Sequence, residues 1–177
     1  YGLAEVQKAV ASGGSTGGGT GGGTPPSGNF DKTLDGTAAG EQLLGTNGRD
    51  WIRALGGNDQ LYGFSGNDLL QGGDGDDTLM GGSGNAANTG DDSLEGGAGK
   101  DQLFGEDGKD GLKGEAGNDY LDGGEGNDTV DGGADDDQLS GGAGDDSLVG
   151  GAGNDKYVFS GAFGQDTIDN SGGGQDW

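Results

Sequence analysis

One apolar residue recurs every nine positions from residue 43 to residue 157 of an otherwise polar chain, interrupted by one longer unit. It stands eighth in each nonapeptide, with aspartate at position 6 and glycines mostly at positions 1, 2 and 4. Gly123–Asp131 (Gly-Gly-Glu-Gly-Asn-Asp-Thr-Val-Asp) is one such unit. A single apolar residue between polar ones is the alternation of a short strand, and glycine-rich stretches are typical of turns. The pattern therefore predicts strands at positions 7–9, separated by turns.

Thirteen units cover residues 36–158, and two of them make one coil of turn, strand, turn and strand. The units begin at residues 36, 45, 54, 63, 72, 81, 96, 105, 114, 123, 132, 141 and 150. Fifteen residues make up the unit at 81, and we expect its excess, near residues 85–90, to bulge outward as a loop. The pattern predicts an all-β fold whose core is the position-8 row: Leu43, Ile52, Leu61, Leu70, Leu79, Leu94, Leu103, Leu112, Leu121, Val130, Leu139, Leu148 and Tyr157.

The N-terminal residues differ in pattern from the repeats. In residues 1–11, Leu3, Val6 and Val10 follow a helical spacing, so we expect the helical end of an upstream domain. Residues 12–28 consist almost entirely of glycine, serine, threonine and proline, which predicts a flexible linker.

The repeat region is expected to span residues 29–158 and to be closed by residues 159–177. Phe159, Phe163 and Ile168 form a denser apolar group than any single repeat carries. A stack of repeats needs a cover for its last apolar rung. We therefore expect residues 159–177 to be a capping segment, incomplete at its end.

Composition argues against an ordinary globular core. The 177 residues include 49 glycines, only 27 isoleucines, leucines, valines and phenylalanines, and a net charge of −24. Such a chain cannot bury enough apolar surface to offset backbone ordering, so something outside the sequence must fold it, or it stays disordered. No apolar run is long enough for a membrane span, and the strong negative charge disfavours nucleic acid as a partner. Histidine and cysteine are absent, which removes the usual zinc and copper ligands.

Oxygen ligands are abundant at a regular spacing. Glycines at positions 1, 2 and 4 tolerate positive φ and can aim backbone carbonyls inward, where the position-6 carboxylate joins them. Calcium takes about 6–8 oxygens, and two stacked turns supply about six. Thirteen turns paired across one coil predict at most eleven Ca²⁺ sites. The position-6 candidates are Asp50, Asp59, Asp68, Asp77, Asp92, Asp101, Asp110, Asp119, Asp128, Asp137, Asp146 and Asp155, with Glu41 in the first unit.

The pattern Gly-Gly-x-Gly-x-Asp-x-U-x, with U a large apolar residue, resembles the RTX (repeats-in-toxin) calcium-binding nonapeptide. The resemblance implies a right-handed parallel β-roll in which each ion lies between one turn and the turn two units later. The first turn would give the carbonyls of positions 2 and 4 and its aspartate, and the second those of positions 1 and 3 and its aspartate. One such site would use Gly124, Gly126, Asp128, Gly141, Ala143 and Asp146. The carbonyl-bearing candidates are Gly57, Gly66, Gly72, Gly73, Asp74, Gly75, Gly81, Ser83, Gly96, Gly97, Ala98, Gly99, Gly105, Asp107, Gly108, Gly114, Ala116, Gly117, Gly123, Gly124, Glu125, Gly126, Gly132, Gly133, Ala134, Asp135, Gly141, Ala143, Gly150 and Ala152.

The resemblance also implies a biological setting. It implies a protein of Gram-negative bacteria that leaves the cell through type I secretion machinery and folds outside it on calcium, as a non-enzymatic structural module. We expect a monomer. Two alternatives remain: an adhesin or surface-layer segment that binds glycans or partner chains, and the non-catalytic tail of a secreted protease or lipase. An exposed aromatic stripe would favour the adhesin, and the linear sequence reveals none.

Several residues depart from the repeat or invite a second interpretation. Leu55 at position 2 and Asp135 at position 4 replace glycines, and we expect backbone strain at Asp135. The position-5 asparagines are expected to favour left-handed turn geometry rather than to bind metal. We interpret Trp51 and Tyr62 as solitary surface aromatics. The lysines at 100, 109 and 113 are expected to be solvated.

Overall fold

The computed structural model describes residues 28–82, 90–159 and 164–177. The helix predicted for residues 1–11, the linker as far as residue 27, Ser83 and most of the expected loop lie outside these ranges. The described residues contain no helix and fifteen strands. The strands are β1 (Lys32–Asp35), β2 (Gln42–Thr46), β3 (Asp50–Gly56), β4 (Gln60–Phe64), β5 (Leu69–Asp74), β6 (Thr78–Met80), β7 (Ser93–Ala98), β8 (Gln102–Asp107), β9 (Gly111–Ala116), β10 (Tyr120–Glu125), β11 (Thr129–Ala134), β12 (Gln138–Ala143), β13 (Ser147–Ala152), β14 (Lys156–Tyr157) and β15 (Thr167–Asp169).

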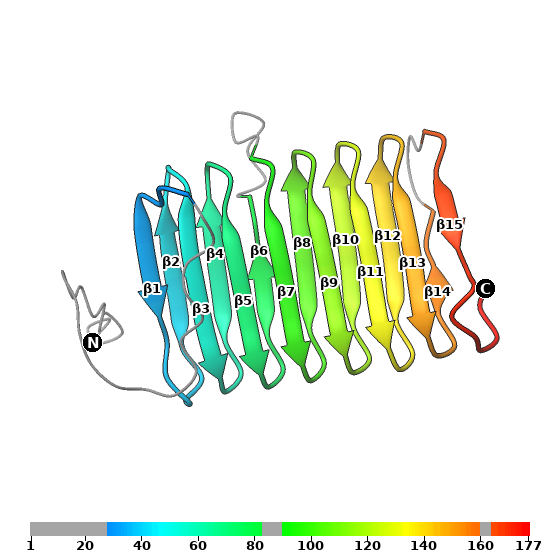
Figure 1. Cartoon of the computed structure of the whole chain (residues 1–177), viewed down its shortest axis with the longest axis horizontal. Helices are drawn as coiled ribbons and strands as arrows, with labels where there is room; N and C mark the ends of the chain where they lie inside the picture. Colours follow the sequence, from blue (N-terminus) through cyan, green and yellow to red (C-terminus); the bar gives the residue numbers. More distant parts are fainter. Residues whose placement is uncertain (1–27, 83–89, 160–163) are drawn as a thin grey trace, which may run out of the picture.

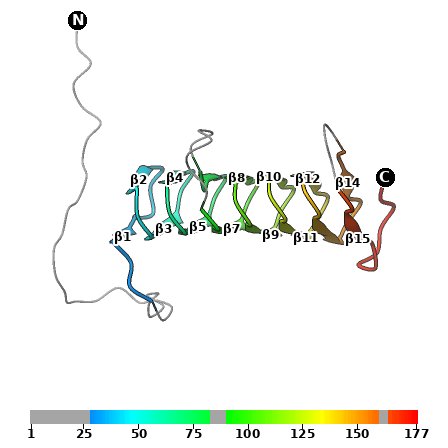
Figure 2. The same ribbon diagram turned by 90° about the horizontal axis from the view of Figure 1, so that it is seen from above.

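Successive strands alternate between two parallel sheets. The odd-numbered strands form an eight-stranded sheet in the order β1-β3-β5-β7-β9-β11-β13-β15, and the even-numbered strands form a seven-stranded sheet from β2 to β14. Figure 1 shows the strands in sequence order from one end of the molecule to the other, and Figure 2 shows the two sheets as separate layers. The predicted all-β parallel β-roll is confirmed.

The core is a double row of position-8 side chains between the sheets. Eleven position-8 residues from Ile52 to Leu148, together with Ala54 at position 1, form one buried cluster, against which Leu34, Leu43 and Tyr157 pack. Within each sheet, paired position-8 residues lie 18 residues apart, as Leu121 and Leu139 do. The burial of one leucine-sized side chain in each half-coil stabilises the roll by about 1.5–3 kcal/mol.

The longer unit changes the pairing step without breaking the rows. Leu70 pairs with Leu94, and Leu79 pairs with Leu103, so both sheets step by 24 residues across the unit at 81. The excess residues therefore leave the apolar phase unchanged.

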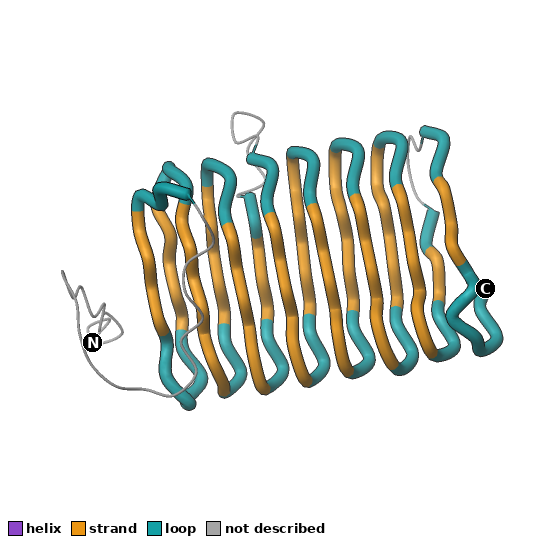
Figure 3. The backbone as a smooth tube through the Cα atoms, in the orientation of Figure 1, coloured by secondary structure: helices purple, strands orange, loops and turns teal. Residues whose placement is uncertain are grey.

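Most strands are longer than the pattern predicted. A typical strand such as β13 has six residues, positions 7–9 of one unit and 1–3 of the next. Its burial alternates, so that Gly150 at position 1 faces inward as Leu148 does. The expectation of three-residue strands with only position 8 inward was wrong, because glycine at position 1 continues the extended backbone. The turns are correspondingly short, as Figure 3 shows.

The glycines serve two different physical needs. Positions 2 and 4 take positive φ, as in Gly124 (106°) and Gly126 (140°). Position 1 does not; Gly123 is needed for space, because a Cβ there would lie 2.6 Å from the Gly141 carbonyl oxygen and closer still to the Asp128 carboxylate. The expectation that glycine stands at position 1 because it tolerates positive φ is therefore wrong.

From the unit at 54 onward, non-glycine residues at positions 2 and 4 keep the same backbone conformation. Leu55, Phe64, Glu106 and Glu115 at position 2 have φ of 74–79°, and Asp135 at position 4 has 77°. The strain expected at Asp135 is present, and position 2 carries it as well, because left-handed backbone costs about 1–2 kcal/mol outside glycine.

Candidate metal centres at the turns

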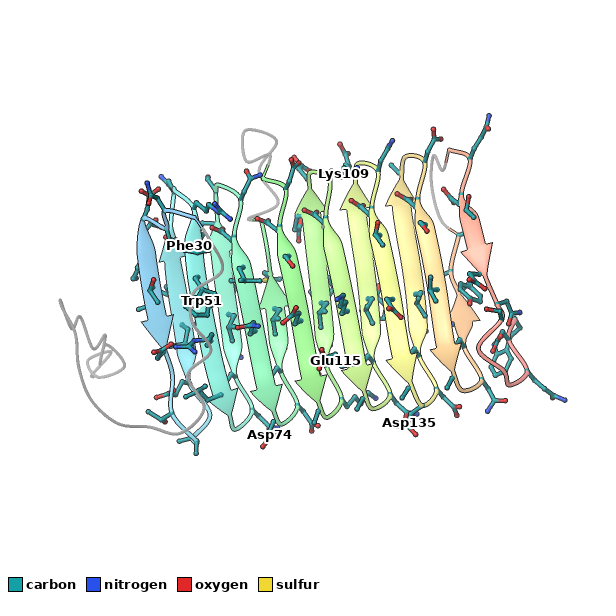
Figure 4. All side chains as sticks on the ribbon, in the orientation of Figure 1. Phe30, Trp51, Asp74, Lys109, Glu115 and Asp135 are labelled. Atoms are coloured by element: carbon teal, nitrogen blue, oxygen red, sulfur yellow. The ribbon has the colours of Figure 1, made fainter. Side chains whose placement is uncertain are left out.

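The position-6 carboxylates form one ladder along each edge of the roll, where the turns lie. Each of the twelve position-6 aspartates is at most 4% exposed. From Asp59 onward, the Oδ1 atom of each accepts a hydrogen bond from the backbone N–H of the position-6 residue one coil earlier. Asp110 N donates to Asp128 Oδ1, and Asp128 N donates to Asp146 Oδ1, each at 2.8 Å. Side chains project from the turns at both edges in Figure 4.

The second carboxylate oxygen is buried without a partner in almost every rung. Among the described residues, the Oδ2 atoms that no hydrogen bond satisfies belong to Asp59, Asp68, Asp77, Asp92, Asp101, Asp110, Asp119, Asp128, Asp137, Asp146 and Asp155. A buried carboxylate oxygen without a donor carries a large desolvation cost. A cation is the group whose chemistry removes that cost.

The carbonyls of positions 2 and 4 point toward the following coil. In the site expected around Asp128, the carbonyl oxygen of Gly124 lies against Gly142, and that of Gly126 lies against Gly144. Both approaches are so close that a Cβ would clash, which explains why glycine stands there.

The carbonyls of positions 1 and 3 point back toward the preceding coil. The Ala143 carbonyl accepts a hydrogen bond from Gly126 N at 2.8 Å. The Gly141 carbonyl and the Asp128 Oδ2 atom both lie beside the missing Cβ of Gly123. The candidate carbonyls and both carboxylates of this site therefore gather at the junction between two stacked turns.

Side chains alone cannot hold an ion. No group of three acidic, histidine or cysteine side chains lies within metal-binding distance in the part of the chain that the structure describes. Any ion at the turns must take backbone carbonyls as well, and a mixed set of carbonyl and carboxylate oxygens suits calcium. The residues present fit that ion.

Burial raises the pKa of the ladder carboxyls. The pKa of Asp92 rises to about 8, mainly because its carboxylate is buried; the Asp68 N–H partly offsets the rise, and the carboxylates of Asp68, Asp110 and Asp91 add to it. The pKa reaches about 7 for Asp68, Asp101, Asp128 and Asp137. For Asp77 and Asp110 it reaches about 6. Burial also raises the pKa of Asp59, Asp119, Asp146 and Asp155. Without a cation, the folded ladder therefore favours protons.

The N-terminal rungs differ from the rest. Asp50 Oδ2 accepts hydrogen bonds from the backbone N–H and hydroxyl of Thr46, so this oxygen is not orphaned. One carboxylate oxygen of Glu41 accepts from Thr37 N at 2.7 Å. Local donors thus occupy these first carboxylates, which makes them poorer cation ligands than Asp128.

Two rungs near the C-terminus were missed by the sequence reasoning. Asp166 Oδ1 accepts from Asp146 N at 3.2 Å, and Asp176 Oδ1 accepts from Asp155 N at 2.8 Å. β15 also pairs with β13, placing Ile168 beside Leu148. The available signal was Gly161-Ala-Phe-Gly-Gln-Asp-Thr-Ile-Asp169, a nonapeptide shifted by two residues from the preceding frame.

The position-5 side chains form an outer ladder instead of setting left-handed backbone. None of the positive-φ residues in the described ranges stands at position 5. Asn58 Oδ1 accepts from Asp76 N at 3.2 Å, and Asn127 Oδ1 accepts from Asp145 N at 3.1 Å. The left-handed interpretation of these asparagines was wrong, because their amide oxygens join neighbouring turns.

The two aromatics expected to be solitary have neighbours. Trp51 is 4% exposed; Phe30 packs on it with ring centroids 6.0 Å apart, and the Arg53 guanidinium lies 4.3 Å from its ring. Tyr62 is half-buried and stacks on Phe64 at 6.3 Å. The interpretation as solitary surface residues was wrong for both. The lysines at 100, 109 and 113 are exposed, as expected.

Two parallel sheets joined by glycine turns, with buried carboxylate ladders along both edges, define a metal-binding β-roll of nonapeptide repeats. The chain belongs to the RTX calcium-binding nonapeptide repeat family, whose model matches overlapping stretches that together run from residue 35 to residue 176. The family is a non-catalytic calcium-binding module, so the turns described above are calcium-binding repeats. The comparison with curated proteins finds no match. No described helix is long and apolar enough to cross a membrane.

Proposed function

We propose that this chain is a calcium-dependent folding module. It lacks ordered structure without Ca²⁺ and folds cooperatively when ions bind between successive turns outside the cell. The single observation that supports this most is the row of eleven buried, partnerless Oδ2 atoms. A net charge of −24 opposes compaction until cations neutralise it, so binding free energy becomes folding free energy.

Each ion would be bound by oxygens of six groups from two stacked turns. These are the carbonyls of positions 2 and 4 and the carboxylate of the first turn, with the carbonyls of positions 1 and 3 and the carboxylate of the second. Each interior turn serves two ions, so binding is cooperative, with up to about eleven ions per chain. Dissociation constants should lie at about 10⁻⁴–10⁻³ M, the range of extracellular calcium modules.

The cellular role follows from this dependence. The chain would cross type I secretion machinery unfolded, in low calcium, and fold as a monomeric, non-enzymatic part of a larger secreted protein of Gram-negative bacteria. Folding at the destination would stabilise or chaperone the rest of that protein.

Far-UV circular dichroism in a chelator and then in millimolar Ca²⁺ tests the proposal. We expect a disordered spectrum that becomes a β spectrum in a sharp titration, and calorimetry then counts the ions. Mg²⁺ should fail to replace Ca²⁺, because it demands octahedral geometry at about 2.0–2.1 Å. A full β spectrum in the chelator would contradict the proposal.

A further inference from the structure

An apolar row crosses the outer face of the seven-stranded sheet. Leu44, Tyr62, Met80 and Phe104 are partners in register on β2, β4, β6 and β8. All four stand at position 9 and point away from the core; Leu44 is 40% exposed, and the other three are half-buried. We call them the apolar row. The next partner is Asp122 on β10, where the row ends.

A second row of uncharged polar side chains runs beside the first. Gln42, Gln60, Thr78 and Gln102 stand at position 7 of the same four strands and are also in register. Three are exposed, and Thr78 is half-buried. We call them the amide row. Each of these four strands therefore presents one amide or hydroxyl side chain and one apolar side chain. This arrangement recurs at the strand spacing of about 4.8 Å.

Aromatic rings widen the apolar row on both sides. Phe64 stacks on Tyr62, and Tyr120 packs against Phe104 with ring centroids 5.7 Å apart. No residue of β2, β4 or β6 is charged, although the chain as a whole carries −24. At the start of the roll, Lys32 Nζ donates to the Leu44 carbonyl at 2.7 Å.

The eight-stranded sheet has no such surface at the same position. Its position-9 row runs through Asp35, Arg53, Gln71, Glu95 and Lys113. These side chains pair with one another: Arg53 bridges to Asp35 at 2.5 Å, and Gln71 donates to Glu95 at 2.6 Å. Figure 2 places the two sheets on opposite sides of the roll, so the two faces are separate surfaces.

We propose that the apolar and amide rows form a binding platform for a neutral, extended polysaccharide lying across the strands. A sugar ring offers an apolar C–H face for the aromatic and aliphatic row and an edge of hydroxyls for the amide row. The platform repeats along the roll axis, and a linear polymer of sugar rings repeats likewise. An acidic polymer would be repelled by this chain, and a neutral one is not.

The platform requires the folded roll, because its members lie 18 or 24 residues apart in sequence. The inference therefore rests on the proposed calcium-dependent folding. Circular dichroism in Ca²⁺ separates the two failures: a chain that does not fold contradicts both proposals, whereas a folded chain that binds no polysaccharide contradicts only the platform.

The experiment mixes the calcium-folded chain with suspended microcrystalline cellulose or chitin and measures depletion of protein from the supernatant. Tyr62→Gln with Phe104→Gln should weaken binding about ten-fold through lost ring stacking, with an unchanged calcium midpoint. Glutamine is chosen because Gln71 already stands at position 9 of the opposite sheet. Lys113→Gln, on that sheet, is the matched control and should bind as the parent chain does.

If the double variant fails to fold, Tyr62→Gln alone and competition of the parent chain with soluble cellohexaose test the same surface. Absence of depletion by either polysaccharide, or equal loss in the Lys113→Gln control, would overturn the platform. Sedimentation velocity covers the protein alternative: self-association that the double variant abolishes would assign the surface to a second copy of this chain instead.

Discussion

At the scale of single residues, the position-6 aspartates link the coils in two ways. The Oδ1 atom accepts the N–H of the preceding coil, and the Oδ2 atom is left for a cation. Substitution of Asp128 by alanine therefore removes both a charged hydrogen-bond acceptor and a proposed calcium ligand. Asp50 differs, because Thr46 already satisfies its Oδ2 atom.

We expect Asp128→Ala to raise the calcium midpoint more than Asp50→Ala. Loss of the Asp128 acceptor alone costs about 1.5–3 kcal/mol, since the bond is to a charged group. Two neighbouring ions lose a ligand as well. Calcium titrations followed by circular dichroism compare the two variants, and equal shifts would mean that the register or the sharing of sites is misassigned.

The raised pKa values predict that protons partly replace calcium. Asp92 ionises with a pKa near 3.8 when unfolded and about 8 when folded, so folding without calcium takes up protons between these values. The stability of the calcium-free roll should fall as pH rises through this window. The facing carboxylates of Asp68, Asp110 and Asp91 add to the raised pKa of Asp92.

In chelator, the β signal in circular dichroism should therefore increase as the pH is lowered from 8 to 5. When calcium is present, lowering the pH should have the opposite effect, because protons compete with the ion for the carboxylates. The calcium midpoint should therefore be higher at pH 5 than at pH 8. Identical chelator spectra at pH 8 and pH 5 would refute the expected proton uptake.

At the scale of the strand and its turn, glycine at position 1 leaves room for two oxygens that lie beside its α-carbon. A Cβ on Gly123 would collide with the Gly141 carbonyl and the Asp128 carboxylate. Gly111, the first residue of β9 and position 7 of its repeat unit, has open space around it by contrast. The atom nearest to a Cβ added there is the Asp92 carbonyl oxygen, at 4.0 Å.

Gly123→Ala should destabilise the calcium-loaded roll by about 1–3 kcal/mol, because backbone must move to admit the methyl group. Gly111→Ala is the matched control and should be neutral or slightly stabilising, since alanine restricts the unfolded chain. Urea unfolding in saturating calcium measures both. A neutral Gly123→Ala would show that the turn has more room than the structure indicates.

At the scale of the whole molecule, the roll is a stack in which each coil contacts only its neighbours. Its final rungs are covered by residues that continue both ladders, through Asp166 and Asp176. Ile168 and Trp177 remain 41% and 68% exposed at this end. Stability of such a stack depends on how its ends are closed.

Deleting residues 159–177 should raise the calcium requirement several-fold. The deletion removes β15 and leaves the N–H groups of Asp146 and Asp155 without their acceptors. Deleting residues 1–27, which precede the described roll, is the control and should change the midpoint little. Equal calcium titrations of the two truncations would mean that the roll nucleates internally.

The sequence alone determined the coil, its core and its ion-binding edges. A nine-residue period places the same residue type at the same structural position in every unit. Leu121 could therefore be assigned to the core and Asp128 to a turn from the sequence alone. The choice of carbonyl ligands came only from the resemblance to the RTX nonapeptide, and it stays a prediction.

The tertiary structure decided what depends on neighbours across coils. The apolar row joins residues such as Met80 and Phe104, whose pairing crosses the 24-residue step and is invisible in a linear pattern. The rungs at Asp166 and Asp176 follow shifts of the nine-residue frame, and strand pairing and hydrogen bonds across coils assign them to the ladders. The hydrogen bond on Asp50 likewise depends on a threonine at a variable position. Periodicity specifies contacts shared by every repeat, whereas lateral contacts between particular side chains require the register that packing sets.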